Sequence, residues 1–199
     1  MKNIQYPVSF KFHVTTFSND FTATDASGET LAYVRQKMFK LKEKISIYSD
    51  KSRNEVNYTI KADRWLDFSA AYSFYNAEGN LLGKVARKGW QSMWKAKYLI
   101  SDNSENQEFT IEEDNGFVKM LDSVLGGIPV LSFFTGYLFN PSYSLKDNNG
   151  KAYVQMKKEP SFFGRKFKLK QLSNFKNEHD DQRILLGYMM MVLLERKRG

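Results

Sequence analysis

The last twenty residues contain an apolar segment that limits what the chain can fold into. From Ile184 to Leu194 every residue is apolar except Gly187 and the hydroxyl group of Tyr188. A helix of this composition has no polar face, and a helix that is apolar on all sides is buried. Eleven residues are also too few to cross a bilayer, which needs about 20. The segment is therefore predicted to be a buried helix rather than a membrane anchor or an interfacial helix.

The signals around this segment place the helix at about residues 181–196. Leucine and methionine favour helix formation. Asp180 and Asp181 suit a helix N-terminus, and the cations that follow Leu194 suit a C-terminus. We expect Gly187 to mark the point where the helix passes close to a surrounding wall.

The rest of the chain contains a threefold internal repeat over residues 21–50, 70–102 and 141–173. Each copy has a short alternating segment, a turn, a second segment that ends in cations, and a third alternating segment. The turns end in Gly28, Gly79 and Gly150. Glycine adopts positive φ without steric cost, which is typical of hairpin turns, and alternation is the period of a half-buried strand. Each copy is therefore predicted to be a three-stranded antiparallel meander.

Three further segments alternate in the same way, namely "VSFKFHV", "NEVNYTIKADR" and "QEFTIEED". They bring the expected total to about twelve strands, with turn signals spaced as in sandwiches and barrels. A closed antiparallel barrel of this size is wide enough to hold one helix. The predicted fold is therefore mostly β. A single domain over residues 1–199 forms a closed antiparallel barrel of about twelve strands around a C-terminal hydrophobic central helix.

Two sets of apolar residues have two interpretations each. Residues 117–141 are apolar but interrupted by glycine, and we expect them to cover one end of the barrel. The alternative is a hydrophobic surface for a partner or lipid. The aromatic residues of the repeat loops either cap the barrel ends or insert at a membrane interface; they are Trp90, Trp94, Phe162 and Phe163.

The net charge of +8 favours anionic partners. Residues 35–44, 84–97 and 157–170 occupy equivalent positions in the repeats and are strongly basic, whereas residues 102–114 contain six acids and no cation. This segregation predicts a basic face that attracts lipid headgroups. The candidate anion-binding residues are Arg87, Lys88, Lys95, Lys97, Arg165 and Lys166. In the alternative interpretation these cations are merely solvated and protect strand edges from aggregation.

Residues that could carry catalysis are scarce. The absence of cysteine excludes disulfides and thiolate chemistry. His13 and His179 are far apart in sequence, and no spacing typical of a metal site surrounds either of them. No glycine-rich phosphate loop follows a strand and opens a helix. We therefore expect a protein that is not an enzyme, with no catalytic residue, no metal and no cofactor.

The repeats and the terminal helix resemble the tubby C-terminal-like superfamily, which includes the LURP-one-related proteins and the phospholipid scramblases. The resemblance is to the bacterial branch of the LURP-one-related family, and it covers nearly the whole chain. The segments that carry it are "FYNAEGNLLGKVARKG", "FFTGYLFNPSYSLKDNNGKAYVQMKKEPSFFGRKFKL" and "LLGYMMMVLLERKRG". Resemblance to this superfamily implies the barrel fold and associates the chain with phosphoinositide binding or lipid scrambling. The chain departs from the scramblase pattern in lacking a cysteine cluster and a calcium loop.

These observations lead to two functional hypotheses. The first is a non-catalytic module that binds anionic phospholipid or a membrane surface through the basic face. The second is an intracellular interaction or scaffold protein with a protein partner and no lipid ligand. Charge alone also allows nucleic acid, but no recognition motif supports it. Without an apolar segment typical of a signal peptide at the start, the expected location is cytoplasmic, at the inner face of the membrane if lipid is bound.

Overall fold

The computed structural model describes residues 4–13, 20–35, 44–63, 71–88, 96–114, 142–160, 165–175, 177 and 180–196. These residues form twelve strands and one helix, α3 (Asp180–Arg196). The strands are β1 (Val8–Phe12), β2 (Phe21–Thr24), β3 (Thr30–Arg35), β4 (Lys44–Tyr48), β5 (Val56–Ala62), β6 (Ala71–Asn76), β7 (Leu81–Arg87), β8 (Lys97–Ser101), β9 (Gln107–Glu113), β10 (Ser142–Asp147), β11 (Ala152–Glu159) and β12 (Lys166–Gln171).

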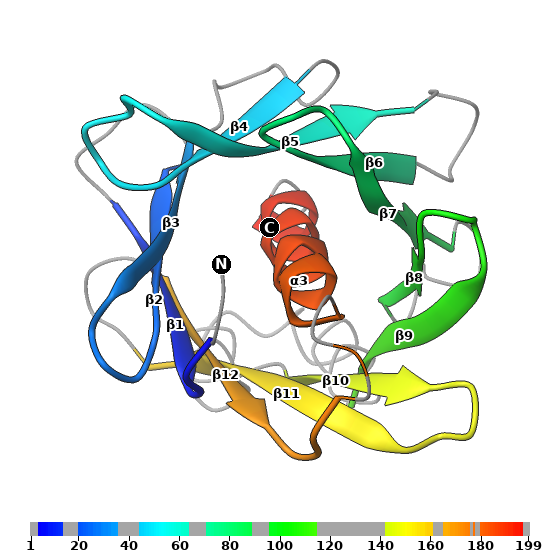
Figure 1. The fold of residues 1–199 in the computed structure, drawn as a ribbon. Coiled ribbons are helices and arrows are strands. Elements are labelled where there is room, and N and C mark those ends of the chain that lie inside the picture. The colour runs from blue at the N-terminus through cyan, green and yellow to red at the C-terminus, as the bar shows by residue number, and fades with distance from the viewer. Residues whose placement is uncertain are drawn as a thin grey trace, which may run out of the picture.

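The twelve strands close into one antiparallel barrel (Figure 1). Each strand pairs with the next one in sequence, and β1 pairs with β12 to complete the ring, with Val8 opposite Leu169 and Lys11 opposite Lys166. A closed barrel has no sheet edge, so every strand in this ring has a neighbour on both sides. The prediction of a closed antiparallel barrel of about twelve strands around a C-terminal helix is confirmed.

The turns of the three repeats share one local mechanism. Strands β2–β4, β6–β8 and β10–β12 lie within the three repeat ranges, and the glycines between the first and second strand have φ values of 86°, 86° and 81°. In each turn, a carboxylate or amide oxygen accepts a hydrogen bond from the backbone N–H four residues later. The acceptors are Asp25, Asn76 and Asp147. The turn between β8 and β9 uses Asp102 in the same way, with Glu105 at a φ of 66° where the repeats have glycine.

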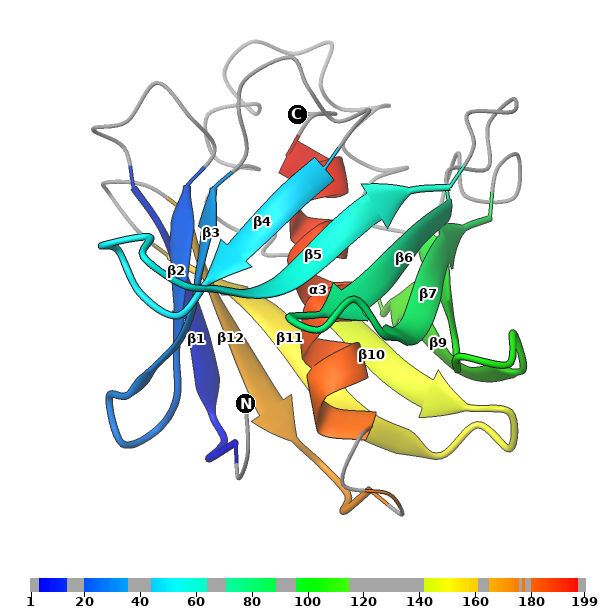
Figure 2. The same ribbon diagram turned by 45° about the horizontal axis from the view of Figure 1, so that its top comes forward.

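The helix α3 passes through the interior of the barrel (Figures 1 and 2). Its residues from Ile184 to Leu193 are buried, and those other than Gly187 are at most 2% exposed. The predicted buried residues are among them, namely Leu185, Leu186, Met189, Met190 and Leu193. The hydroxyl group of Tyr188 donates a hydrogen bond to the carbonyl oxygen of Val154 at 3.2 Å, so this buried polar group has a partner.

Gly187 lies where the helix meets the barrel wall. A Cβ atom at this position would be 2.7 Å from Cδ1 of Ile100 in β8, which is closer than side-chain contacts allow. The expectation that this glycine marks a close approach to the wall is therefore confirmed.

The barrel has two distinct ends, which we name the turn end and the loop end (Figure 2). The turn end holds the N-terminus of α3 and the turns around Gly28, Gly79 and Gly150. At the loop end, α3 finishes, β3, β7 and β11 finish, and β4, β8 and β12 begin. The predictions for residues 117–141, and for the aromatic residues Trp90, Trp94, Phe162 and Phe163, lie outside the described residues.

The burial of α3 leads to a prediction about Met190. Replacing this fully buried side chain with aspartate places an unpaired carboxylate in an apolar interior, which is strongly unfavourable. We expect Met190→Asp to lower the free energy of unfolding by more than about 4 kcal/mol, a large share of the stability of a typical domain. Urea denaturation measures the loss. Ala77→Asp, at an exposed turn position, is the control, and equal small losses in both variants would contradict the buried helix.

Candidate functional site

Antiparallel connectivity brings the repeated basic stretches to one end of the barrel. In each repeat the second strand finishes at the loop end and the third strand starts there, so the cations on both sides of the connection lie at that end. Described cations of the repeats at this end are Arg35, Lys44, Arg87, Lys88, Lys97, Lys157, Lys158, Arg165 and Lys166; Lys11 and Lys61 lie at the same end, opposite Lys166 and Lys44. The basic stretches that recur in the sequence therefore gather at one end of the barrel axis.

The candidate residues occupy two separate sectors of the loop end. Arg87 ends β7, Lys88 follows it, and Lys97 begins β8. Arg165 and Lys166 lie at the start of β12, and three strands (β9, β10 and β11) separate the two groups around the wall. Lys95 lies outside the described residues.

The β7–β8 sector is electrically mixed. The Nζ atom of Lys97 is 2.6 Å from a carboxylate oxygen of Glu112, its cross-strand partner. The guanidinium group of Arg87 lies 6.0 Å from the ring centre of Tyr98, and the hydroxyl group of Tyr98 donates a 2.5 Å hydrogen bond to Glu195 of α3. Burial, together with the charge of Glu195, raises the pKa of Tyr98. Lys97 therefore has an acidic partner, and Arg87 lies beside a tyrosine that is bonded to the end of the helix.

The β12 sector continues into a second, more uniform surface, which we name the lysine wall. It consists of the outward lysines of β11, β12 and β1, namely Lys157, Lys166, Lys168, Lys170 and Lys11. These side chains alternate along their strands with inward residues such as Phe10, Met156 and Leu169, which are fully buried. The acid on these three strands is Glu159, with a carboxylate oxygen 3.8 Å from the Nζ atom of Lys168.

The register of the three strands places like charges directly opposite one another. Lys157 is the cross-strand partner of Lys168, and Lys11 is the partner of Lys166, which has Glu159 as its partner on the other side. Like charges in such pairs are destabilising. Lysine on a sheet often protects an open edge, but these strands have neighbours on both sides in the closed ring. Edge protection therefore does not explain the lysine wall.

Sequence reasoning counted the lysines of residues 157–170 but missed Lys11. The alternation of "VSFKFHV" already places Lys11 on the opposite face from Phe10 and Phe12. The pairing of β1 with β12 could not be predicted from the sequence, because it joins residues more than 150 positions apart.

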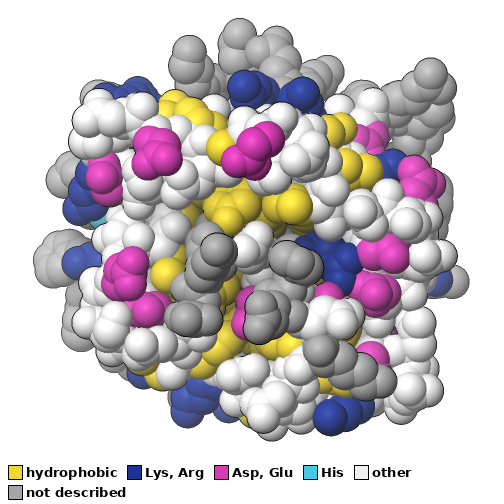
Figure 3. Space-filling model, viewed as in Figure 1, with side chains coloured by type: hydrophobic (Ala, Val, Ile, Leu, Met, Phe, Trp, Pro, Cys, Tyr) yellow, Lys and Arg dark blue, Asp and Glu magenta, His cyan; other side chains and the backbone are white. Residues whose placement is uncertain are grey.

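The turn end has the opposite character. Acidic side chains are distributed around this end in Figure 3. They include Asp25, Glu29, Glu78, Asp102, Glu105, Glu108 and Asp147. The barrel therefore has unlike charge at its two ends, and the turn end is the less suited of the two to an anionic partner.

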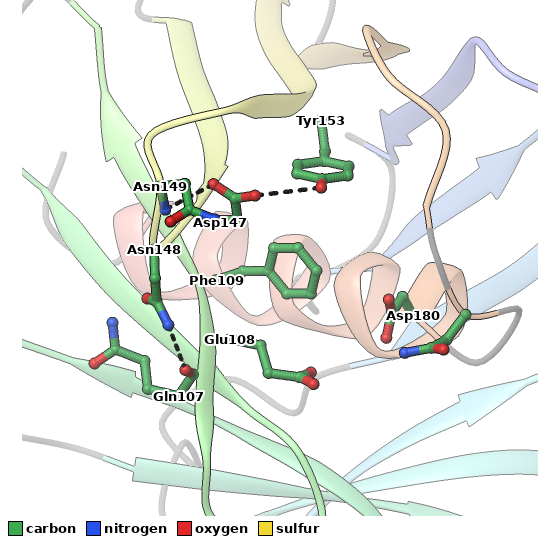
Figure 4. Close-up of a pocket in the computed structure, with 9 residues that line it drawn as sticks. Gln107, Glu108, Phe109, Asp147, Asn148, Asn149, Tyr153 and Asp180 are labelled. Atoms are coloured by element: carbon green, nitrogen blue, oxygen red, sulfur yellow. Dashed lines mark hydrogen bonds between the residues drawn. The ribbon is translucent and has the colours of Figure 1, made fainter.

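A pocket of about 220 Å³ opens at the turn end between β9, the β10–β11 turn and the start of α3 (Figure 4). Its carboxylates are bound by donors of the chain itself. Arg183 donates to Glu108 and, at 2.6 Å, to Asp180. Asp147 accepts hydrogen bonds from the backbone of the turn and from Tyr153. This arrangement ties the start of the helix to the barrel, and the pocket provides no free carboxylate for a ligand.

Comparison with known proteins gives one family match. The model of a family described as LURP-one-related matches residues 30–127. Over this part of its length the chain is similar to the LURP-one-related family. No curated protein matches the sequence. Among solved structures, the X-ray structure of a protein from Arabidopsis thaliana has a TM-score of 0.49 and 13% identity to the chain, over 95% of this chain and 93% of that one.

Similarity to the LURP-one-related family suggests a tubby-like binding module, a fold that is generally non-catalytic. Within the described residues, no group of three or more potential ligands could hold a metal ion. The described part of the chain also contains no helix with the length and hydropathy needed to span a membrane.

The contacts of Arg183 lead to a stability prediction. Its side chain is 8% exposed and that of Asp180 is 5% exposed, so removing the cation leaves a buried carboxylate uncompensated. We expect Arg183→Met to cost about 3–5 kcal/mol of unfolding free energy. Lys84→Met is the control, because Lys84 pairs with the exposed Glu105 and such pairs contribute at most about 1 kcal/mol. Denaturation curves at pH 7 measure both, and similar losses would contradict the role assigned to Arg183.

Proposed function

We propose that the protein is a non-catalytic binding module that associates peripherally with anionic phospholipid headgroups through its basic surface. The observation that carries the proposal is the lysine wall, in which four of five lysines form like-charge cross-strand pairs. Such pairs destabilise the folded protein when it is unbound, and an anionic surface relieves the repulsion between the paired lysines. Similarity to the LURP-one-related family supports the binding-module part of the proposal.

The magnitude of the attraction is sufficient for reversible association. A cation near an anionic leaflet contributes about 1 kcal/mol. Five lysines, reduced by the charge of Glu159, therefore supply about 4 kcal/mol, which is roughly a thousandfold in the partition coefficient. Lysine also suits this role because its ammonium group is a compact, hydrated charge, whereas arginine suits fixed bidentate recognition.

The composition of the lysine wall favours lipid over single-stranded nucleic acid. Proteins that bind single strands combine cations with aromatic rings on which bases stack. The outward residues interleaved among the lysines are instead Ser9, Gln155 and Glu159. A protein-interaction or scaffold role without a lipid ligand is the second candidate, and absence of vesicle binding would favour it.

The proposal predicts salt-sensitive binding to anionic vesicles. We expect the protein to co-sediment with vesicles that contain phosphatidylserine but not with phosphatidylcholine alone. Binding should fall steeply between about 0.05 and 0.5 M salt, because added ions screen surface charges. Reversing Arg165 and Lys166 to glutamate should weaken binding without a large change in melting temperature, since Lys166 is exposed and Arg165 half-buried.

The matched control reverses two exposed lysines outside the lysine wall, Lys61 in β5 and Lys151 in the β10–β11 turn. It changes the net charge by the same amount and should retain more binding. Equal binding to neutral and anionic vesicles, or no binding to either, would contradict the proposed function.

A further inference from the structure

We propose that the barrel docks on its side, with the outer face of β11, β12 and β1 against the membrane and the barrel axis along its surface. This inference rests on the proposed function and adds the docking face and the orientation. It concerns the lysine wall, of which only Lys166 belongs to the candidate residues identified from the sequence.

The first argument is the density of charge on the lysine wall. Residues two apart on a strand are separated by about 6.8 Å, and neighbouring strands by about 4.8 Å. Lys166, Lys168 and Lys170 occupy successive outward positions on β12, and Lys157 and Lys11 lie on the strands to either side. Five ammonium groups therefore project from an area of roughly 14 by 10 Å. All five side chains project from the same face of the sheet, so their ammonium groups can contact a flat membrane surface together.

The second argument is that the barrel ends are poorer docking surfaces. At the loop end, Lys97 of β8 is paired with Glu112, and the cations of β7 and β8 are three strands away from β12. The turn end carries the acidic side chains seen in Figure 3, which an anionic membrane repels. The cations of the loop end are distributed around the ring from β3 to β12, whereas the five lysines of the lysine wall lie on three neighbouring strands, so end-on docking presents a less concentrated charge.

The third argument comes from the opposite wall. Strand β5 lies across the barrel from β11 and β12 in Figure 1. It also has a like-charge pair, Lys44 with Lys61, but the Nζ atom of Lys61 lies 4.7 Å from the ring centre of Tyr75. The opposite wall therefore has one pair of lysines, whereas the lysine wall has five lysines. This difference favours docking through the lysine wall alone.

The absence of cysteine gives a direct way to measure orientation. A single cysteine can be introduced at Ser9 in the lysine wall, at Lys61 on the opposite wall, or at Ala77 in a turn at the turn end. Each variant is labelled with a fluorophore that responds to a less polar environment and is mixed with phosphatidylcholine vesicles with or without phosphatidylserine. We expect a blue shift at Ser9 with anionic vesicles, and little change at Lys61 or Ala77.

A charge-reversal series tests the same inference through affinity. The variant Lys157→Glu, Lys168→Glu, Lys170→Glu should bind anionic vesicles at least about tenfold more weakly than the wild type. The matched control, Lys44→Glu, Lys61→Glu, Lys151→Glu, has the same net charge and should lose less than about threefold. Replacing Lys157 and Lys168 with glutamine is a milder variant, which should weaken binding while leaving the melting temperature unchanged or higher, because it removes a like-charge pair.

The outcomes separate the inference from the proposed function. If the wild type does not bind anionic vesicles, the proposed function is wrong, and the docking face is wrong with it. If the wild type binds but the probes at Ser9 and Lys61 respond equally, side-on docking is overturned and headgroup binding stands. Binding by the folded lysine-wall variant that equals that of the matched control would overturn the inference in the same way.

Discussion

The burial of α3 is the constraint on which the rest of the structure depends. A helix that is apolar on every side needs a surrounding surface that is apolar throughout, and a closed barrel provides one from the inward residues of all its strands. The fit leaves little free space, since a Cβ atom on Gly187 would contact Ile100. The wall also bonds to polar groups of the helix: Tyr188 donates to the carbonyl oxygen of Val154, and Arg183 donates to Glu108.

Closure of the ring around the helix also determines what the outer surface can do. The pairing of β1 with β12 removes the sheet edge and at the same time joins Lys11 to the lysines of β12. Antiparallel connectivity brings the cationic ends of the repeats to the loop end, while the tight turns leave acidic side chains at the turn end. The electrostatic polarity of the molecule therefore follows from the same topology that encloses the helix.

Individual elements show how far the sequence could be interpreted. The glycine turns were predictable because a positive φ and an Asx acceptor are local requirements, and the structure has both at Gly28, Gly79 and Gly150. The turn at Glu105 has the same geometry without glycine, so its conformation could not be read from that signal. The role of Gly187 was predictable for a different reason. A residue without a side chain, in a helix whose other residues are bulky, implies that another part of the chain approaches closely at that point.

The sequence by itself determined the local elements and the burial of the helix, because hydrophobic periodicity, turn residues and segment length are properties of neighbouring positions. It also indicated that positive charge recurs at equivalent points of each repeat. Only the tertiary structure decided which cations share a surface. Cross-strand register and ring closure join residues far apart in the chain, so they placed Lys11 beside Lys166 and separated Lys166 from Arg87. No local pattern encodes these distances, and the candidate site therefore had to be redrawn around the closed barrel.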